Sequence, residues 1–338
     1  MSVKSKSIIG VLLVLFFISG LIVQKYFHFL SEEQSNILPL RQSSLTENSY
    51  KFIDPLLAVR NPSTSPEFLA LQNKIVDYID LEKKSGNIST ASVYFRDQNN
   101  SGGFSINPTE NYSPASLIKV PLMIAYYKIA ETNPSILEKK LSYSGEDMNK
   151  FETFRSPIGI APNTQYSVDQ LISYMIKYSD NNAAETLIRN LNQTGQFNYQ
   201  NDLFKDMGID QVDLTDDYIT VRAYSLFFRI LYNATYLNRE MSEKAMRLLS
   251  QADFSGGIES GVPNNYLVSQ KFGEFTVKDK GGDVVKRELH NCGVIYYTDH
   301  PYLLCIMTKG EDFGQLKNFI SNVSRTTFEY VENLYSKK

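Results

Sequence analysis

The alternation of apolar and polar positions predicts a helix and two strands near the start of the folded part of the chain. From Pro66 to Gly86, apolar residues recur at helical spacing and the run ends at a glycine, which predicts one helix. Residues 90–97 and 102–107 alternate as strands do, with the turn-forming sequence QNNS between them.

The rest of the pattern predicts helices followed by strands. An apolar helix follows Ser116, and helical spacing continues to about Leu249. Residues 266–275 read as a strand, two β-rich runs flank the turn at 298–301, and a final helix covers about Phe313 to Tyr335. We therefore expect an α/β (α+β) fold, in which an antiparallel sheet built from both chain ends is flanked by helices and the middle forms a helical lobe.

Polarity also sets the expected domain limits. Residues 31–65 are polar, contain several prolines and interrupt the periodicity, apart from a short apolar segment at 52–59. We interpret them as an extracytoplasmic spacer between an N-terminal stub and anchor, residues 1–30, and one domain over residues 66–336.

The N-terminal stretch is predicted to be a membrane anchor. Residues 7–24 are uncharged over eighteen positions, near the minimum length of a transmembrane helix. No small-x-small cleavage pattern follows and no cysteine is placed for a lipid anchor, so a single uncleaved helix is favoured over a signal peptide. Lys4 and Lys6 favour a cytoplasmic N-terminus, although Lys25 weakens that signal. The domain is then expected outside the cell membrane.

Charge and cysteine content narrow the possible partners. Thirty-four basic and thirty-seven acidic residues give a net charge of −3, without the basic excess of nucleic-acid binding proteins, so no nucleic acid is expected. Two cysteines and three histidines lack metal-ligand spacing, so no metal is expected either. Cys292 and Cys305 flank the predicted hairpin turn, and both a disulfide and buried free thiols remain open.

Ser116 and Lys119 are the first candidates for chemistry. In "ENYSPASLIKVPLMIAYY" the serine stands where a helix begins, and the lysine follows three positions later on the same face. A serine hydroxyl needs a base to become a nucleophile, and the histidines are poorly placed for this task. A buried lysine can be neutral and accept the proton. The alternative is an N-capping serine beside a lysine that reaches to solvent.

Two further segments add polar groups. In "YSDNNAAETLI", Ser179, Asp180 and Asn181 open another helix, either as simple caps or with the Ser179 hydroxyl relaying a proton and the Asn181 amide holding a substrate carbonyl. In "GVPNNYLVSQKFG", Lys271 would supply a positive field for a substrate carboxylate, and Gly273 would let a ligand backbone approach the strand.

Ser-x-x-Lys, Ser-Asp-Asn and Lys-x-Gly in this order resemble the class A β-lactamases and the penicillin-binding serine peptidases. The likeness extends to "SPASLIKVPLM", "YMIKYSDNNAAETLI" and "SGVPNNYLVSQKFG", and covers residues 66–336. It implies a serine hydrolase without a cofactor, acylated by a β-lactam or by a D-Ala-D-Ala-like peptidoglycan peptide.

The resemblance also implies a role for each residue. Ser116 would attack a carbonyl, Lys119 would accept its proton, and Ser179 would pass a proton to the departing nitrogen. Substrate contacts would come from the Asn181 amide at the acyl side chain, from Lys271 at the substrate carboxylate, from Gly273, and from an oxyanion hole formed by the backbone amides of Ser116 and Glu274.

The third motif departs from the family at Phe272. The family has threonine or serine at this place, and a phenyl ring cannot donate a hydrogen bond to a carboxylate, so weaker affinity for ordinary β-lactams is expected. Lys280, Gly281 and Gly282 form a rival third motif, but the spacing from "SGVP" favours Lys271.

A second departure concerns deacylation. Class A β-lactamases carry a glutamate that activates water, and its usual Glu-x-x-Leu-Asn sequence is missing here. Asp213, Asp216 and Asp217 are nearby carboxylates, which helix capping also explains. We therefore expect a long-lived acyl-enzyme, as in a penicillin-binding peptidase. The alternatives are a true β-lactamase with an aspartate as the replacement base, and a non-catalytic module that binds cell-wall fragments.

Overall fold

The computed structural model describes residues 40–41, 50–58, 65–195, 202–206 and 219–336. The predicted anchor lies outside these residues, as do the three aspartates considered for deacylation. Within the described residues, no helix combines the length and apolar character that crossing a membrane requires.

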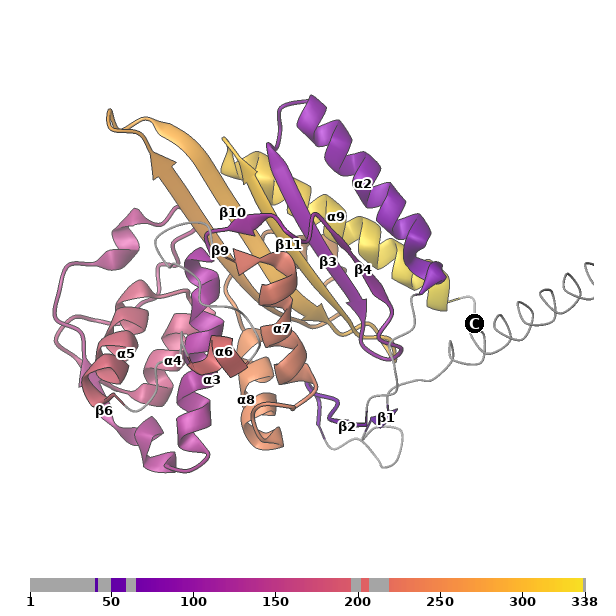
Figure 1. Ribbon diagram of the computed structural model, residues 1–338. Coiled ribbons are helices and arrows are strands. Elements are labelled where there is room, and N and C mark those ends of the chain that lie inside the picture. Colours follow the sequence, from indigo (N-terminus) through magenta and orange to yellow (C-terminus); the bar gives the residue numbers. More distant parts are fainter. Residues whose placement is uncertain (1–39, 42–49, 59–64, 196–201, 207–218, 337–338) are drawn as a thin grey trace, which may run out of the picture.

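A five-stranded antiparallel sheet forms the centre of the protein (Figure 1). Its strands, in spatial order, are β4 (Gly103–Ile106), β3 (Thr90–Asp97), β11 (Tyr302–Gly310), β10 (Val284–Ile295) and β9 (Val268–Lys278). The first two strands of this order come early in the chain and the other three come late. The predicted sheet built from both chain ends is thus confirmed, and β9 forms one of its edges.

Two helices cover one face of this sheet, α2 (Leu69–Lys84) and α9 (Phe313–Tyr335). The short 3-10 helix η3 (Pro66–Phe68) leads into α2. The buried residues Leu71, Ile75 and Ile79 of α2 recur at helical spacing and pack in one apolar cluster with the sheet and α9. The final helix has the bounds that the sequence predicted.

The middle of the chain forms a helical lobe on the other face. Its helices are α3 (Lys119–Ala130), α4 (Val168–Lys177), α5 (Asn181–Thr194), α6 (Phe204–Asp206), α7 (Val221–Tyr232) and α8 (Arg239–Leu249). Residues 119–127 of α3 are all buried, so this helix is the centre of the lobe and a second apolar cluster surrounds it. The predicted helix-rich stretch is confirmed.

Short elements complete the described part of the chain. They include three small antiparallel pairs: β1 (Leu40–Arg41) with β2 (Leu56–Ala58), β5 (Asn111–Tyr112) with β8 (Ile219–Thr220), and β6 (Lys140–Ser142) with β7 (Gln165–Ser167). The other 3-10 helices in the described part of the chain are η4 (Ala115–Ile118), η5 (Pro134–Glu138), η6 (Met148–Phe151) and η8 (Glu259–Gly261). Phe52 and Ile53, in the predicted spacer, are buried in the apolar cluster of the lobe.

The two cysteines face each other on neighbouring strands. Cys292 of β10 is paired in register with Cys305 of β11, and a disulfide joins them. Of the two states that the sequence left open, the structure has the bonded one.

Candidate active site

Ser116 lies in the 3-10 turn η4, directly before α3. The α-helix begins at Lys119, three residues later than the pattern predicted, because Ala115 has a φ of 46° and the turn at Pro114 is closed by a bond from Leu117 N to Pro114 O. The turn packs against the edge strand β9. Ser116 is 7% exposed and Lys119 is 3% exposed, so the two side chains meet in a nearly dry environment.

Lys119 Nζ lies within hydrogen-bond distance of four oxygens. It donates to Ser179 O at 2.5 Å and to Asn181 Oδ1 at 2.6 Å, and it lies 2.8 Å from Ser116 Oγ and 3.1 Å from Ser179 Oγ. A neutral amine has two hydrogens, and the carbonyl and amide oxygens need both because neither can donate. The nitrogen lone pair is then left for a hydroxyl, and the nearer hydroxyl is that of Ser116.

The surroundings favour this neutral form. Burial lowers the pKa of Lys119 to about 8, and the carboxylates of Glu152, Asp180 and Glu274 oppose this shift. Burial also holds the pKa of Lys271 well below its usual range, and the charge of Lys119 lowers it further. The two lysines therefore resist being charged at the same time.

Ser179 connects the two lysines. It stands between α4 and α5 with a φ of 55°, and its hydroxyl lies 3.1 Å from Lys119 Nζ and 2.9 Å from Lys271 Nζ. Lys271 Nζ also donates to Phe272 O at 3.0 Å. A hydroxyl can accept from one amine while it donates to the other, so Ser179 can carry a proton across this part of the site.

Gly273 permits the close approach of β9 to the turn η4, which carries Ser116. A Cβ at this position would lie 2.9 Å from Pro114 O, 3.0 Å from Leu117 N and 3.1 Å from Ser116 N. The backbone amides of Ser116 and of Glu274, the residue after this glycine, are thus kept at the same end of the site. A carbonyl oxygen placed there would be stabilised as it gains negative charge.

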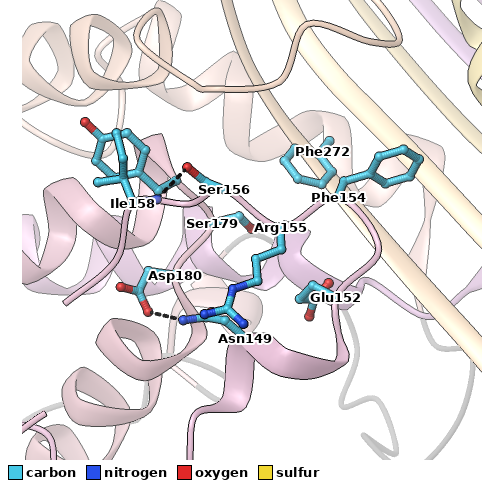
Figure 2. A pocket seen from close by; sticks show the side chains of 10 residues that line it. Asn149, Glu152, Phe154, Arg155, Ser156, Ile158, Ser179, Asp180 and Phe272 are labelled. Carbon is cyan, nitrogen blue, oxygen red and sulfur yellow. Dashed lines mark hydrogen bonds between the residues drawn. The ribbon is translucent and has the colours of Figure 1, made fainter. Parts of the chain in front are cut away.

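Through hydrogen bonds, Asp180 joins the loop between α4 and α5 to the segment that precedes α4. It caps α5 through bonds from Asn182 N and Ala183 N, and it also accepts from Asn149 Nδ2 at 3.0 Å and from Ile160 N at 2.7 Å. Figure 2 shows the bond between Asp180 and Asn149. The sequence identified Asp180 as a cap but gave no sign of this second function.

A cleft of about 260 Å³, open solvent included, lies beside Ser179 (Figure 2). It is lined by Asn149, Glu152, Phe154, Arg155, Ser156, Ile158, Tyr178, Ser179, Asp180 and Phe272. The ring of Phe272 is 4% exposed, stacks on Phe254 with 4.0 Å between ring centroids, and meets Phe154 edge-on. The expected hydroxyl of the third motif is thus replaced by one member of an aromatic cluster.

Two carboxylates, one lining this cleft and one beside it, were not identified from the sequence as side chains of the site. Glu152 Oε1 accepts a hydrogen bond from Asn181 Nδ2 at 2.7 Å. The carboxylate of Glu274 accepts from Thr153 N at 3.0 Å and Phe154 N at 2.6 Å, and burial raises its pKa. The side chain of Glu274 therefore fixes the loop beside the cleft, in addition to the role expected of its backbone.

The structure brings together the residues singled out from the three motifs: Ser116, Lys119, Ser179, Asn181, Lys271 and Gly273. The rival third motif lies elsewhere, because Lys280 is exposed in the turn between β9 and β10. Asp216 and Asp217 fall in residues 207–218, outside the described part of the chain.

Comparison with known proteins gives a family and a fold. The β-lactamase enzyme family matches residues 70–331. The solved structure of PBP-A shares 16% identity at a TM-score of 0.65, covering 81% of this chain and 100% of that chain. A variant of PBP-A, solved as the acyl-enzyme complex with penicillin G, shares 18% identity at a TM-score of 0.63, covering 78% and 97%.

A class A β-lactamase from Mycobacterium abscessus is also similar, with 19% identity, a TM-score of 0.63, and coverage of 76% of this chain and 99% of that chain. No curated protein matches the sequence significantly. The matched family spans more than half of the chain and includes all three motifs. This chain therefore belongs to the β-lactamase enzyme family and is a serine hydrolase that acts on amide bonds.

Proposed function

We propose that this protein is a membrane-anchored extracytoplasmic hydrolase in which Ser116 is acylated by β-lactams or by D-Ala-D-Ala-like peptides and released slowly. The observation that carries the proposal is the position of Lys119 Nζ, buried and 2.8 Å from Ser116 Oγ. Support for the β-lactam comes from the family and from the penicillin G complex of the PBP-A variant. The anchor rests on the apolar residues 7–24.

In the proposed acylation, Ser116 Oγ attacks the carbonyl carbon while Lys119 takes the hydroxyl proton. The oxyanion receives hydrogen bonds from the amides of Ser116 and Glu274, each a contribution of about 3 kcal/mol in sites of this kind. The C–N bond then breaks, and the proton passes from Lys119 through Ser179 to the nitrogen. A water molecule or an amine later attacks the acyl carbon and frees Ser116.

Asn181 and Lys271 are proposed to position the substrate. The Asn181 side chain binds the acyl side chain next to the scissile carbonyl, and Lys271 provides a positive field toward a carboxylate on the leaving-group side. The bond from Lys271 Nζ to Ser179 Oγ supports a second task, in which Lys271 orients the hydroxyl that carries the proton.

Mass spectrometry of the intact protein after incubation with benzylpenicillin tests the proposal. We expect one covalent adduct that persists over many minutes, and no adduct in Ser116→Ala. Rapid turnover of a chromogenic cephalosporin would instead support a true β-lactamase. Absence of an adduct with any acylating probe would contradict acylation and favour a module that binds cell-wall fragments.

A further inference from the structure

Glu152 stands at the point where an acyl side chain would leave the catalytic groups. It follows the 3-10 helix η6, lines the cleft and is half-buried. Its Oε1 accepts from Asn181 Nδ2 at 2.7 Å, while Asn181 Oδ1 accepts from Lys119 Nζ at 2.6 Å. Glu152 is therefore the next side chain outward from Asn181, on the side away from Lys119.

The backbone on both sides of Glu152 is held in place. On one side, Asn149 Nδ2 donates to Asp180 and Asn149 Oδ1 accepts from Asn181 N at 2.7 Å. On the other side, the amides of residues 153 and 154 donate to the carboxylate of Glu274. A carboxylate on such a fixed segment keeps its distance to a bound substrate, which is what charge selection requires.

Glu152 forms no direct ion pair in the described part of the chain, although its charge acts on the two buried lysines Lys119 and Lys271 and raises the pKa of each. Among the described residues, no lysine or arginine forms an ion pair with it, and its Oε2 has no hydrogen-bond partner there. Arg155, which lines the same cleft, is paired with Asp147 at 2.8 Å. A buried second carboxylate, that of Glu274, is close enough for the charge of Glu152 to raise its pKa. This part of the cleft therefore favours a cation and repels an anion.

We propose that Glu152 selects acyl donors whose side chain carries an ammonium group close to the scissile carbonyl. The inference rests on the proposed acylation of Ser116 and adds the class of substrate: a peptide in which an amine-bearing residue lies on the acyl side of the bond that is broken. The ammonium donates to Glu152 Oε2, while Oε1 stays bound to the Asn181 amide. Glu152 is a specificity-determining residue and takes no part in the proton transfers.

Three penicillins that differ in one substituent test this selection. The probes are benzylpenicillin, its α-amino derivative and its α-carboxy derivative, compared by the rate of adduct formation at about pH 6.5, where an α-amino group of pKa about 7.7 to 8.0 is charged. We expect the amino derivative to acylate Ser116 about tenfold faster than the carboxy derivative, with benzylpenicillin between them. Tenfold corresponds to about 1.4 kcal/mol.

Glu152→Gln is the informative variant, because its amide oxygen can still accept from Asn181 Nδ2 while the charge is gone. In this variant, we expect the acylation rate with the α-amino derivative to exceed that with the α-carboxy derivative by less than about threefold. Removing this charge also lowers the pKa of Lys119. That change affects the acylation rates with all three probes equally, so it cancels when two of these rates are divided. Glu152→Asp keeps the charge, so the three penicillins should keep the same order of acylation rates. Glu185→Gln, at an exposed ion pair on α5, is the control and should show the rates of the unmodified protein.

The outcomes separate the two proposals. Equal rates for the three penicillins in the unmodified protein, or an order that survives in Glu152→Gln, would overturn the selection and leave acylation of Ser116 intact. Absence of any adduct at Ser116 would refute the proposed function, and the selection with it. Equal rates for the three penicillins can be observed in the unmodified protein alone, so the selection can be refuted even if a variant fails to fold.

Discussion

Two parts of the candidate site, which we call the floor and the wall, are built in different ways. The floor, Ser116, Lys119, Ser179 and Lys271, stands at the ends of helices and on a strand, and its side chains are at most 8% exposed. The wall, residues 149–158, is a connecting segment with several exposed side chains, held mainly by hydrogen bonds to Asp180, Asn181 and Glu274. We infer that the floor sets whether a substrate reacts and the wall sets which substrate reacts.

The largest expected effect comes from the floor, at Lys119. Arginine stays protonated and cannot accept the Ser116 proton, so Lys119→Arg should lower the acylation rate by about 10³-fold, within the range of general base catalysis. Lys119→Met, which has a side chain of similar length without an amine, should lower the acylation rate by a similar factor. Stopped-flow acylation by benzylpenicillin measures both. Lys244→Arg, at a half-exposed ion pair, is the control, and a Lys119→Arg rate within tenfold of the unmodified protein would exclude Lys119 as the base.

Gly273→Ala tests the contact between strand β9 and the turn η4, which carries Ser116. The new methyl group would lie within about 3 Å of backbone atoms of Pro114, Ser116 and Leu117, so the turn must shift away from the oxyanion position. We expect a loss of about 10²-fold in acylation rate, the size of one missing oxyanion donor. Gly281→Ala, in the exposed turn between β9 and β10, should leave the rate unchanged. Normal acylation by Gly273→Ala would place the oxyanion hole elsewhere.

The pH dependence of acylation tests the state of the floor. Lys119 acts as a base only when neutral, and burial lowers its pKa to about 8. The neutral fraction falls tenfold for each pH unit below that pKa, so the rate should rise from pH 6 to about 8 and then level off. Glu152 raises this pKa, so Glu152→Gln should move the profile to lower pH. A profile that is flat over this range would show that Lys119 does not limit acylation.

The floor was more predictable from the sequence than the wall, for a physical reason. Ser116, Ser179 and Lys271 stand next to helices and a strand whose apolar periodicity is visible in the chain. Glu152 lies in a segment without periodicity, and one of the bonds that fix this segment joins Thr153 to Glu274, 121 residues later. The same limit applies to the start of α3, because the positive φ of Ala115 leaves no trace in the hydrophobic pattern.

The smallest expected effect lies at Phe272, where floor and wall meet. Threonine would restore a hydroxyl beside Lys271, so Phe272→Thr should acylate about tenfold faster with a carboxylate-bearing penicillin, since a hydrogen bond to a charged group contributes about 1.5 kcal/mol or more.

The same substitution removes a ring stacked on Phe254, and a loss of about 3 kcal/mol in the free energy of unfolding is expected. Phe272→Leu loses the ring without gaining a hydroxyl, so it separates the two consequences. Equal acylation rates in the threonine and leucine variants, measured beside urea denaturation curves, would mean that the hydroxyl adds nothing here. The aromatic ring would then serve the packing of the wall against β9, and the substrate carboxylate would depend on Lys271 alone.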